Sequence, residues 1–292
     1  MSATPGERFR RLLAERDVLL TVGAFDGLSA RLVEQVGGDV VYMSGSAVST
    51  SVHGKPDIGL TTMTEMVDRA RGFVEAVDVP VFCDADTGYG NALNVRRTIQ
   101  AFERAGVAAV HIEDQEFPKR CGHFEGKRVV PREEAVQRVR AAVDASDDIA
   151  VVARTDARAV EGLDEAIARG RAFADAGADA LFVEAPRSRA ELERIGTELA
   201  DQYLLANVVE GGETPLLSAD ELAGLDYDIA LFPTAGQRAV IRTLQTVYDE
   251  ILTEGTQAGV LDRVADWEER NEVTGLAEFT ALEREYAVDG DD

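Results

Sequence analysis

The sequence predicts an α/β protein built on a (β/α)₈ TIM-type barrel, with extra helices at its C-terminus. Short apolar, β-rich runs alternate with amphipathic stretches over the first 256 residues, and there are eight such runs. Glycine stands at several joins between a helical stretch and the next strand. A doubly wound open sheet is the alternative, but residues 23–27 (GAFDG) match its glycine-rich fingerprint poorly.

The strand candidates are five or six residues long, which suits the wall of a barrel. We expect them at residues 18–22, 39–43, 80–84, 108–113, 149–154, 179–184, 203–207 and 228–232. Between them, apolar residues recur every three or four positions and predict helices, for example at 63–77, 94–105, 132–145 and 163–176. Gly37-Gly38, Gly106 and Gly177 occupy three helix-to-strand joins, where a left-handed glycine ends a helix.

Residues after about 257 do not fit a ninth unit. The segment 262–286 predicts one or two acidic helices that carry Trp267, Phe279 and Tyr286, and these aromatic side chains need a surface to cover. We therefore expect a catalytic barrel over 1–256, a helical extension over 257–288 and a disordered tail over 289–292.

Composition excludes several classes of function. The formal net charge of −24 makes nucleic acid a poor partner. No run approaches the ~20 apolar residues of a membrane span, and the N-terminus lacks an apolar signal core, so we expect a cytoplasmic protein. Lysine occurs only at positions 55, 119 and 127. An acidic, lysine-poor composition indicates a halophile, although an acidic protein from a GC-rich mesophile is the alternative.

Polar residues stand at the carboxyl ends of the predicted strands, where a (β/α)₈ barrel carries its active site. In chain order they are Tyr42 to Ser46, Asp84 and Asp86, Glu113 and Asp114, Arg154 to Asp156, Glu184, and Asn207. Converging carboxylates repel one another unless a cation compensates, and oxygen ligands favour Mg²⁺, or else Mn²⁺. The alternative is that each acid only caps a helix. That reading is weaker for Asp84 and Glu113, which end apolar strands directly.

Cys121 lies in a long polar loop, residues 115–128, after the fourth predicted strand. The neighbouring Lys119, Arg120 and His123 favour the thiolate and keep the thiol reactive. Cys83, one residue before a strand-end acid, is expected to face the helices and to be structural. With two cysteines and no export signal, both are expected to be reduced.

These motifs resemble the isocitrate lyase/phosphoenolpyruvate mutase superfamily, in its carbon–carbon lyase branch. The resemblance runs along nearly the whole chain, through GAFDGLSARL, YMSGSAV, PDIGLTT, CDADTGYGN, HIEDQ, PKRCGH, ARTDA and NVVEGGETP. KRCGH at 119–123 is the specific segment, whereas GAFD and DADTGYG are shared more widely. The resemblance implies Mg²⁺-dependent retro-aldol cleavage of a 2-hydroxycarboxylate, a small di- or tricarboxylate. It also implies a homotetramer whose subunits exchange a C-terminal helix.

The resemblance also assigns roles. Asp84 would ligate Mg²⁺, and Asp57, Asp86 and Glu113 would hold its waters. Cys121 would protonate the carbanion-like intermediate. Further catalytic candidates are Tyr42, which would take the hydroxyl proton, Arg154, which would pair with the substrate carboxylate and the developing oxyanion, Glu113 and His123. The substrate-binding candidates are Ser44, Gly45, Ser46, Asp57, Lys119, Arg120, Gly122, Glu184, Asn207 and Arg238.

The substrate indications disagree. At the positions of Phe182 and Leu231 the sequence resembles the 2-methylisocitrate lyases. Cleavage of 2-methylisocitrate to pyruvate and succinate is therefore the favoured activity. Segment 207–215 is more similar to relatives that cleave substituted malates, decarboxylate oxaloacetate or rearrange phosphonates, and segment 122–127 resembles the lyases of substituted malates. The alternatives are a lyase of isocitrate, 2,3-dimethylmalate or another substituted malate, an oxaloacetate decarboxylase, a phosphonate mutase, and a non-catalytic acid-binding barrel. Cys121 argues against the decarboxylase and the mutase, which do not need this proton donor.

Overall fold

The computed structural model describes residues 3–122 and 124–287. Two compact units, residues 1–235 and 236–292, divide the chain one helix earlier than the domain boundary expected at 256/257. The helix α11 (Ala235–Glu254) opens the second unit, whereas the sequence assigned this stretch to the barrel. The predicted tail at 289–292 lies outside the described residues.

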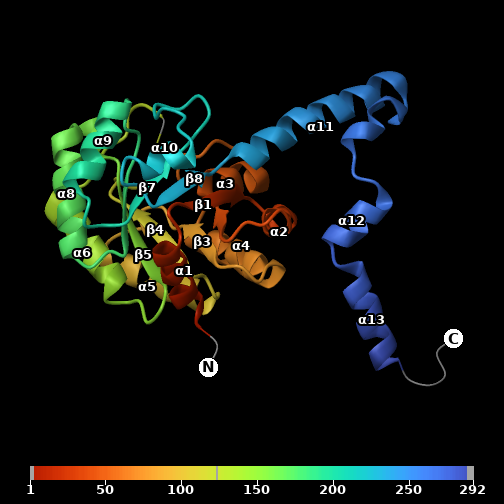
Figure 1. Ribbon diagram of the computed structural model, residues 1–292, viewed down its shortest axis with the longest axis horizontal. Coiled ribbons are helices and arrows are strands. Elements are labelled where there is room, and N and C mark those ends of the chain that lie inside the picture. The colour runs from red at the N-terminus through yellow and green to blue at the C-terminus, as the bar shows by residue number, and fades with distance from the viewer. Residues whose placement is uncertain (1–2, 123, 288–292) are drawn as a thin grey trace. The chain divides into compact units, whose positions relative to one another are not determined.

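The first unit is a closed barrel of eight parallel strands in the order β1 to β8, which confirms the predicted fold class (Figure 1). Each expected strand is present, and each end lies within two residues of its expected position. The strands are β1 (Leu19–Ala24), β2 (Val41–Met43), β3 (Val81–Asp84), β4 (Ala109–Glu113), β5 (Ala150–Thr155), β6 (Ala180–Val183), β7 (Leu204–Asn207) and β8 (Ile229–Phe232).

Helices surround this barrel and bury one apolar face each. They are α1 (Pro5–Glu15), α2 (Gly27–Gln35), α3 (Gly45–His53), α4 (Met63–Ala76), α5 (Ala92–Arg104), α6 (Arg132–Val143), α7 (Ala157–Val160), α8 (Leu163–Asp175), α9 (Arg189–Glu198) and α10 (Ala219–Ala223). Gly106 and Gly177 have φ angles of 88° and 95°, so the left-handed joins predicted after α5 and α8 are confirmed.

Helix α1 closes the amino-terminal end of the barrel. Phe9 is fully buried, and its ring centroid lies 5.7 Å from that of Phe82, inside the barrel. Gly6 is required at this junction, because a Cβ there would lie 2.0 Å from the carbonyl oxygen of Asp148. Sealing this end leaves the carboxyl ends of the strands as the open face, where the polar strand ends meet.

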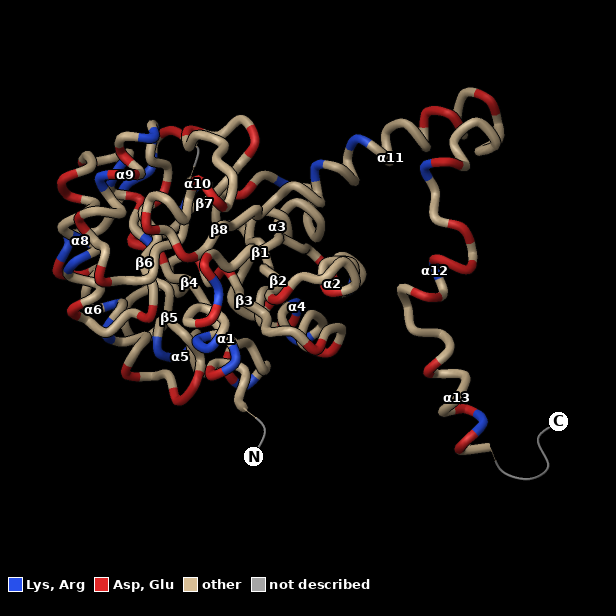
Figure 2. Tube along the Cα trace, in the orientation of Figure 1, with Lys and Arg blue, Asp and Glu red and all other residues tan. Residues whose placement is uncertain are grey.

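The second unit contains α11, a 3₁₀ turn (Ala258–Arg263), α12 (Trp267–Val273) and α13 (Leu276–Tyr286), so the acidic helices expected within 262–286 are present. Trp267 and Tyr286 are 73% and 74% exposed. Acidic residues occur along the outer helices of the first unit and along the second unit (Figure 2). None of the described helices is both long and apolar enough to cross a membrane.

Candidate active site

A pocket opens at the carboxyl ends of the strands and brings together most of the residues predicted to act. Its lining comes from β2, β3, β5 to β8 and the loop after β4, and its cavity measures about 70 Å³. The predicted residues that line it are Tyr42, Ser44, Ser46, Asp57, Asp84, Lys119, Cys121, Gly122, Arg154, Glu184 and Asn207. The apolar part of the wall includes Phe182, Val209, Leu231 and Pro233.

The N-terminus of α3 forms one wall. Ser44 caps the helix by accepting the N–H of Ala47 at 3.2 Å. The helix comes so close to β3 that a Cβ on Gly45 would lie 2.5 Å from Asp84 Oδ2. Only glycine therefore lets a helix N-terminus, with its positive dipole end, stand beside this carboxylate. Such an arrangement suits a bound carboxylic acid.

Lys119 is a buried cation between two acids. Its Nζ lies 2.6 Å from Asp57 Oδ1 and 2.7 Å from Asp86 Oδ1. Burial opposes the charge, but the carboxylates of Asp86 and Asp57 raise the pKa of Lys119 well above its usual value. The ammonium is therefore held charged, and it fixes the Cys121 loop to the strand-three end of the barrel.

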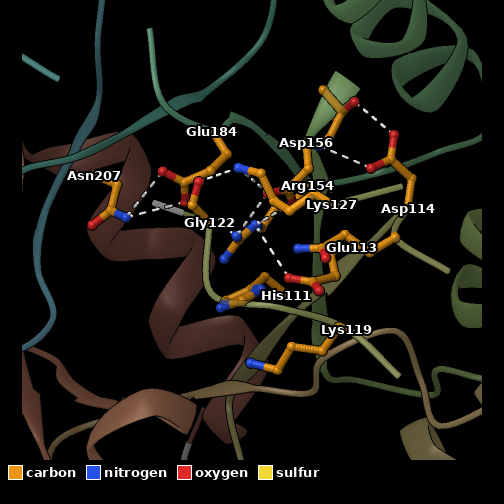
Figure 3. A network of polar contacts seen from close by, with 12 residues as sticks. His111, Glu113, Asp114, Lys119, Gly122, Lys127, Arg154, Asp156, Glu184 and Asn207 are labelled. Atoms are coloured by element: carbon orange, nitrogen blue, oxygen red, sulfur yellow. Dashed lines mark hydrogen bonds and ion pairs between the residues drawn. The ribbon is translucent and has the colours of Figure 1, made fainter. Parts of the chain in front are cut away.

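Arg154 compensates three further carboxylates. Its Nε lies 2.9 Å from Asp156 Oδ2 and 3.3 Å from Glu113 Oε2, and its Nη2 lies 3.3 Å from Glu184 Oε2. Against the effect of burial, these acids raise the pKa of Arg154 well above its usual value. Glu184 in turn accepts the amide of Asn207 at 3.1 Å. Figure 3 shows these side chains converging from neighbouring strands.

These pairs correct one step of the sequence argument. The clustered acids do not depend on a metal alone for compensation, because Lys119 pairs with two of them and Arg154 with three. No group of three or more metal-ligating side chains forms among residues 3–122 and 124–287. Asp84 stands apart: it lines the pocket, and its Oδ1 lies 3.5 Å from Nε2 of His111.

The donor set nonetheless fits Mg²⁺. This ion keeps several waters and is commonly bound through one or two carboxylates. Burial opposes ionisation of Asp84, but His111, Lys119 and Arg154 lower its pKa to about 2, so it is a carboxylate at neutral pH. Within the described part of the chain, Glu113 Oε1 is buried without a hydrogen-bond partner and could accept from a metal-bound water. Asp84 would therefore hold the ion, with Glu113 behind it.

Tyr42 and His111 form a buried pair that the sequence analysis missed in part. The Tyr42 hydroxyl lies 2.7 Å from His111 Nε2. Burial raises the pKa of Tyr42 well above its usual value and lowers that of His111 to about 4, so the phenol is protonated and the imidazole neutral. Strand alternation could have revealed His111, because residues two apart on β4 face the same side and Glu113 was already placed inside.

The loop after β4 carries Cys121 to the pocket. The N–H of Cys121 donates to the Asp57 carbonyl at 3.1 Å. The side-chain amide of Gln115 accepts from the backbone N–H of Arg120 and donates to the backbone carbonyl of Arg120. Gly122 approaches so closely that a Cβ there would lie 2.6 Å from Arg154 Nη2. Neither cysteine forms a disulfide, and Cys83 is fully buried between the sheet and the helices, as expected for a structural residue.

Behind the pocket, Asp156 and Asp114, which the sequence placed among the strand-end acids, form a second layer of polar contacts. The backbone N–H of Asp156 donates to Asp114 Oδ1 at 2.8 Å. Asp114 Oδ2 accepts from the hydroxyl of Thr155 and from Arg169 of α8, at 2.6 and 3.0 Å. Arg169 is 1% exposed. A charged residue on the apolar face of the predicted helix was the sequence signal that could have revealed a buried partner for these acids.

Some predicted residues do not line the pocket. Asp86 and Glu113 are buried beside it. Arg120 has an exposed side chain and lines a different surface depression. Arg238 lies on α11, in the second unit, and His123 is outside the described residues. Their assigned parts in binding and catalysis stay predictions.

Known proteins resemble this chain over nearly its full length. A family described as phosphoenolpyruvate phosphomutase matches residues 9–252. The 2,3-dimethylmalate lyase of Eubacterium barkeri is 44% identical, over 96% of this chain and 98% of the relative. The 2-methylisocitrate lyase of Halalkalibacterium halodurans is 40% identical, over 96% of this chain and 93% of the relative.

Solved structures give the same picture. An oxaloacetate acetylhydrolase in complex with the inhibitor 3,3-difluorooxalacetate superposes with a TM-score of 0.93 and 32% identity, covering 99% of each chain. A phosphonopyruvate hydrolase complexed with oxalate and Mg²⁺ superposes with a TM-score of 0.87 and 28% identity, over 97% of this chain and 99% of the other.

Proposed function

The chain belongs to the phosphoenolpyruvate mutase/isocitrate lyase superfamily, and we propose that it is a magnesium-dependent carbon–carbon lyase that cleaves 2-methyl-substituted malates and releases pyruvate. One observation carries this proposal. Cys121, Asp84 and Arg154 line a single pocket together with the hydroxyls of Ser44 and Ser46. A proton donor, a metal-binding carboxylate and an anion-binding wall therefore face one another, as a retro-aldol cleavage requires.

The keto-acid half of the substrate lies against the α3 N-terminus. Ser44 and Ser46 offer hydroxyls there, and the amides of the first helical turn offer N–H donors to its carboxylate. When bound at Asp84, Mg²⁺ supplies a positive charge beside the oxygens on which negative charge grows. Arg154 supplies a second positive charge, and its orientation is already fixed by three acids.

The reaction begins with loss of the C2 hydroxyl proton. Because Tyr42 is a protonated phenol, it takes this proton only as it passes its own to His111 Nε2, 2.7 Å away. The C2–C3 bond then breaks, pyruvate leaves with the new carbonyl group, and the electron pair passes to C3 and its carboxylate. The Cys121 thiol donates its proton to C3, which completes the saturated acid. Solvent returns the proton from His111 to the Cys121 thiolate.

Within this class we place 2-methylisocitrate first, with succinate as the second product. Phe182 and Leu231, the residues that resemble 2-methylisocitrate lyases, both line the pocket. The guanidinium of Arg154 lies 4.9 Å from the centre of the Phe182 ring. This wall is therefore next to the reacting groups. There, the presence or absence of one methyl group on the substrate changes its binding free energy in the transition state by roughly 1–3 kcal/mol.

The second candidate is 2,3-dimethylmalate, and a specific observation favours it. Among the described residues that line the pocket, the cations are Lys119 and Arg154, and both are already paired with acids. The third carboxylate of 2-methylisocitrate needs a further cation, which 2,3-dimethylmalate does not. The 44% identity to a 2,3-dimethylmalate lyase points the same way.

A substrate panel tests the proposal. The protein is incubated with Mg²⁺ at high salt and, separately, with 2-methylisocitrate, 2,3-dimethylmalate, isocitrate, oxaloacetate and phosphonopyruvate, and keto acid is followed. We expect pyruvate from the first two and the larger kcat/KM for 2-methylisocitrate. A larger kcat/KM for 2,3-dimethylmalate would reverse the order of the two. The lyase proposal fails if no hydroxy acid releases keto acid.

We further propose a cytoplasmic homotetramer in which the second unit is exchanged between subunits. The exposed apolar side chains of α11 to α13, such as Trp267, Phe279 and Tyr286, support an interface. Light scattering coupled to gel filtration tests the assembly: we expect four times the 31.5 kDa chain mass. A monomer at micromolar concentration would contradict it.

A further inference from the structure

Of the chain's three lysines, Lys119 lines the pocket and Lys55 is exposed, whereas Lys127 turns its side chain inward from an otherwise exposed stretch of the loop. Its side chain is 5% exposed. The Nζ donates to the carbonyl of Gly122 and lies 3.4 Å from Asp156 Oδ1 (Figure 3). A buried ammonium needs such partners to offset its lost hydration. Lys127 therefore joins the Cys121 loop to the end of β5.

Asp156 is a fixed anchor for this bridge. It is fully buried, and its carboxylate also accepts from Arg154 Nε and Nη2, at 2.9 and 3.2 Å. Its backbone N–H is held by Asp114, which Arg169 and Thr155 hold in turn. One carboxylate thus orients both the catalytic guanidinium and the lysine of the loop.

The bridge ends beside the reactive thiol. Gly122 follows Cys121 directly, and its α-carbon is so close to Arg154 and Glu184 that an added Cβ would lie 2.6 and 2.7 Å from them. Where the Gly122 carbonyl is placed therefore decides where the Cys121 side chain lies relative to the pocket. An error of about 1 Å in the placement of a reacting group can cost roughly 10²-fold in rate.

We propose that Lys127 is a positioning residue for Cys121: it holds the Gly122 carbonyl against Asp156, and so sets the thiol at the pocket in register with Arg154. Its effect on cleavage rests on the proposed lyase function. Its effect on the placement of Cys121 does not, and the two are measured separately.

The first measurement is the alkylation rate of Cys121 by iodoacetamide, followed by mass spectrometry on the full-length protein without substrate. In Lys127→Met the loop loses its tie to Asp156, and we expect Cys121 to react several-fold faster than in the wild type. Lys55→Met, which removes an exposed lysine, is the matched control and should leave the rate unchanged. Cys83, fully buried, reports any global unfolding within the same sample. An equal Cys121 rate in Lys127→Met and Lys55→Met overturns the proposal.

The second measurement is steady-state cleavage of the best substrate. Lys127→Met should lower kcat roughly 10- to 100-fold with little change in KM, because the substrate is bound but the proton donor is misplaced. Lys127→Arg keeps the charge and should recover part of both kcat and thiol protection, whereas Lys127→Gln should behave as Lys127→Met. A loss confined to KM, or no recovery in Lys127→Arg, contradicts a positioning role. If the wild type cleaves no substrate, the lyase proposal has failed, and the alkylation rates still decide the role of Lys127.

Discussion

Lys119 and Arg154 are the cations that pair with the acids around the pocket. Each is buried and each holds at least two carboxylates, so the acids at the strand ends are ordered before any ligand arrives. Preorganised charges of this kind act in a transition state without first having to rotate into place. Cys121 and the Tyr42–His111 pair lie at the same pocket and provide the two proton transfers of the proposed cleavage.

Replacing Cys121 by serine should lower kcat at least about 100-fold, because a hydroxyl is a much weaker acid than a thiol towards a carbanion-like intermediate. Binding of a keto acid such as pyruvate should be retained, since Ser44, Ser46 and Asp84 are untouched. Stopped assays and calorimetric titration measure the two quantities. The matched control is Cys83→Ala, which should keep its kcat and lose thermal stability through a core cavity. A Cys121→Ser variant with full activity would contradict the role of Cys121 as the proton donor.

The imidazole of His111 should stay neutral until the pH falls to about 4, because burial lowers its pKa more than the nearby Asp84 carboxylate raises it. In the unfolded chain this ring takes up its proton near pH 6.5. The contribution of His111 to the free energy of unfolding is therefore complete above about pH 6.5 and is lost as the pH falls towards about 4.

Nuclear magnetic resonance of the ring protons checks this pKa. The protein has three histidines, and the signal that vanishes in His111→Asn should titrate near pH 4. A midpoint near 6.5 for that signal would contradict the assigned environment, and with it the acceptor role of Nε2 towards Tyr42.

The strands and helices of the barrel were readable from sequence because each has a local cause. Apolar runs of five or six residues define the strands, and Gly106 and Gly177 mark helix ends through their left-handed φ angles. Helix α1 was not identified, although Thr4, Pro5 and Glu7 form a local signal for a helix start. The role of Phe9 as a plug for the barrel could not be read, because it depends on strands far away in the chain. The loop after β4 was found by its composition, whereas its ties to Asp57, Gln115 and Asp156 were not.

The loop after β4 gives a prediction of its own. Gly122→Ala should lower kcat at least about tenfold, because the new Cβ would lie 2.6 Å from Arg154 Nη2 and 2.7 Å from Glu184, and the loop must withdraw. Gly72→Ala makes the same chemical change inside α4, where nothing lies within 4 Å of the new Cβ.

Gly72→Ala should therefore keep its activity and gain about 0.5–1 kcal/mol in free energy of unfolding. Kinetics and thermal denaturation of both variants provide the test. Wild-type kcat in Gly122→Ala would show that the loop does not pack against Arg154 during turnover.

Taken as a whole, the molecule carries a net charge of −24, spread over both compact units (Figure 2). Self-repulsion of this size destabilises the folded chain at low ionic strength, and salt screens it, since the Debye length falls from about 10 Å at 0.1 M to about 3 Å at 1 M. This is the physical basis for proposing a halophilic protein.

Thermal denaturation in KCl tests that proposal. The Tm should rise steeply up to about 1 M salt and then level off as screening becomes complete. Equal concentrations of sucrose serve as a control for general exclusion effects. A Tm that is flat or falls between 0.1 and 1 M KCl would contradict a stability limited by self-repulsion.

The candidate site was predictable only as far as the topology carries residues to one end of the barrel. Strand-end position placed Asp84, Arg154, Glu184 and Asn207 at one pocket, as the structure has them. The compensation of the acids by Lys119 could not be deduced, because Asp57 and Asp86 meet it from two separate loops. The bridge from Lys127 to Asp156 was hidden for the same reason, because Asp156 lies 29 residues further along the chain.

The most direct test of the proposed activity is pyruvate release from 2-methylisocitrate or 2,3-dimethylmalate, measured with Mg²⁺, after EDTA treatment and after Mg²⁺ is restored. We predict cleavage with Mg²⁺, its loss in EDTA and full recovery on re-addition, and we predict that Asp84→Asn stays inactive under all three conditions. Pyruvate release that persists unchanged in EDTA and in Asp84→Asn, or no pyruvate under any condition, would contradict a magnesium-dependent lyase centred on this pocket.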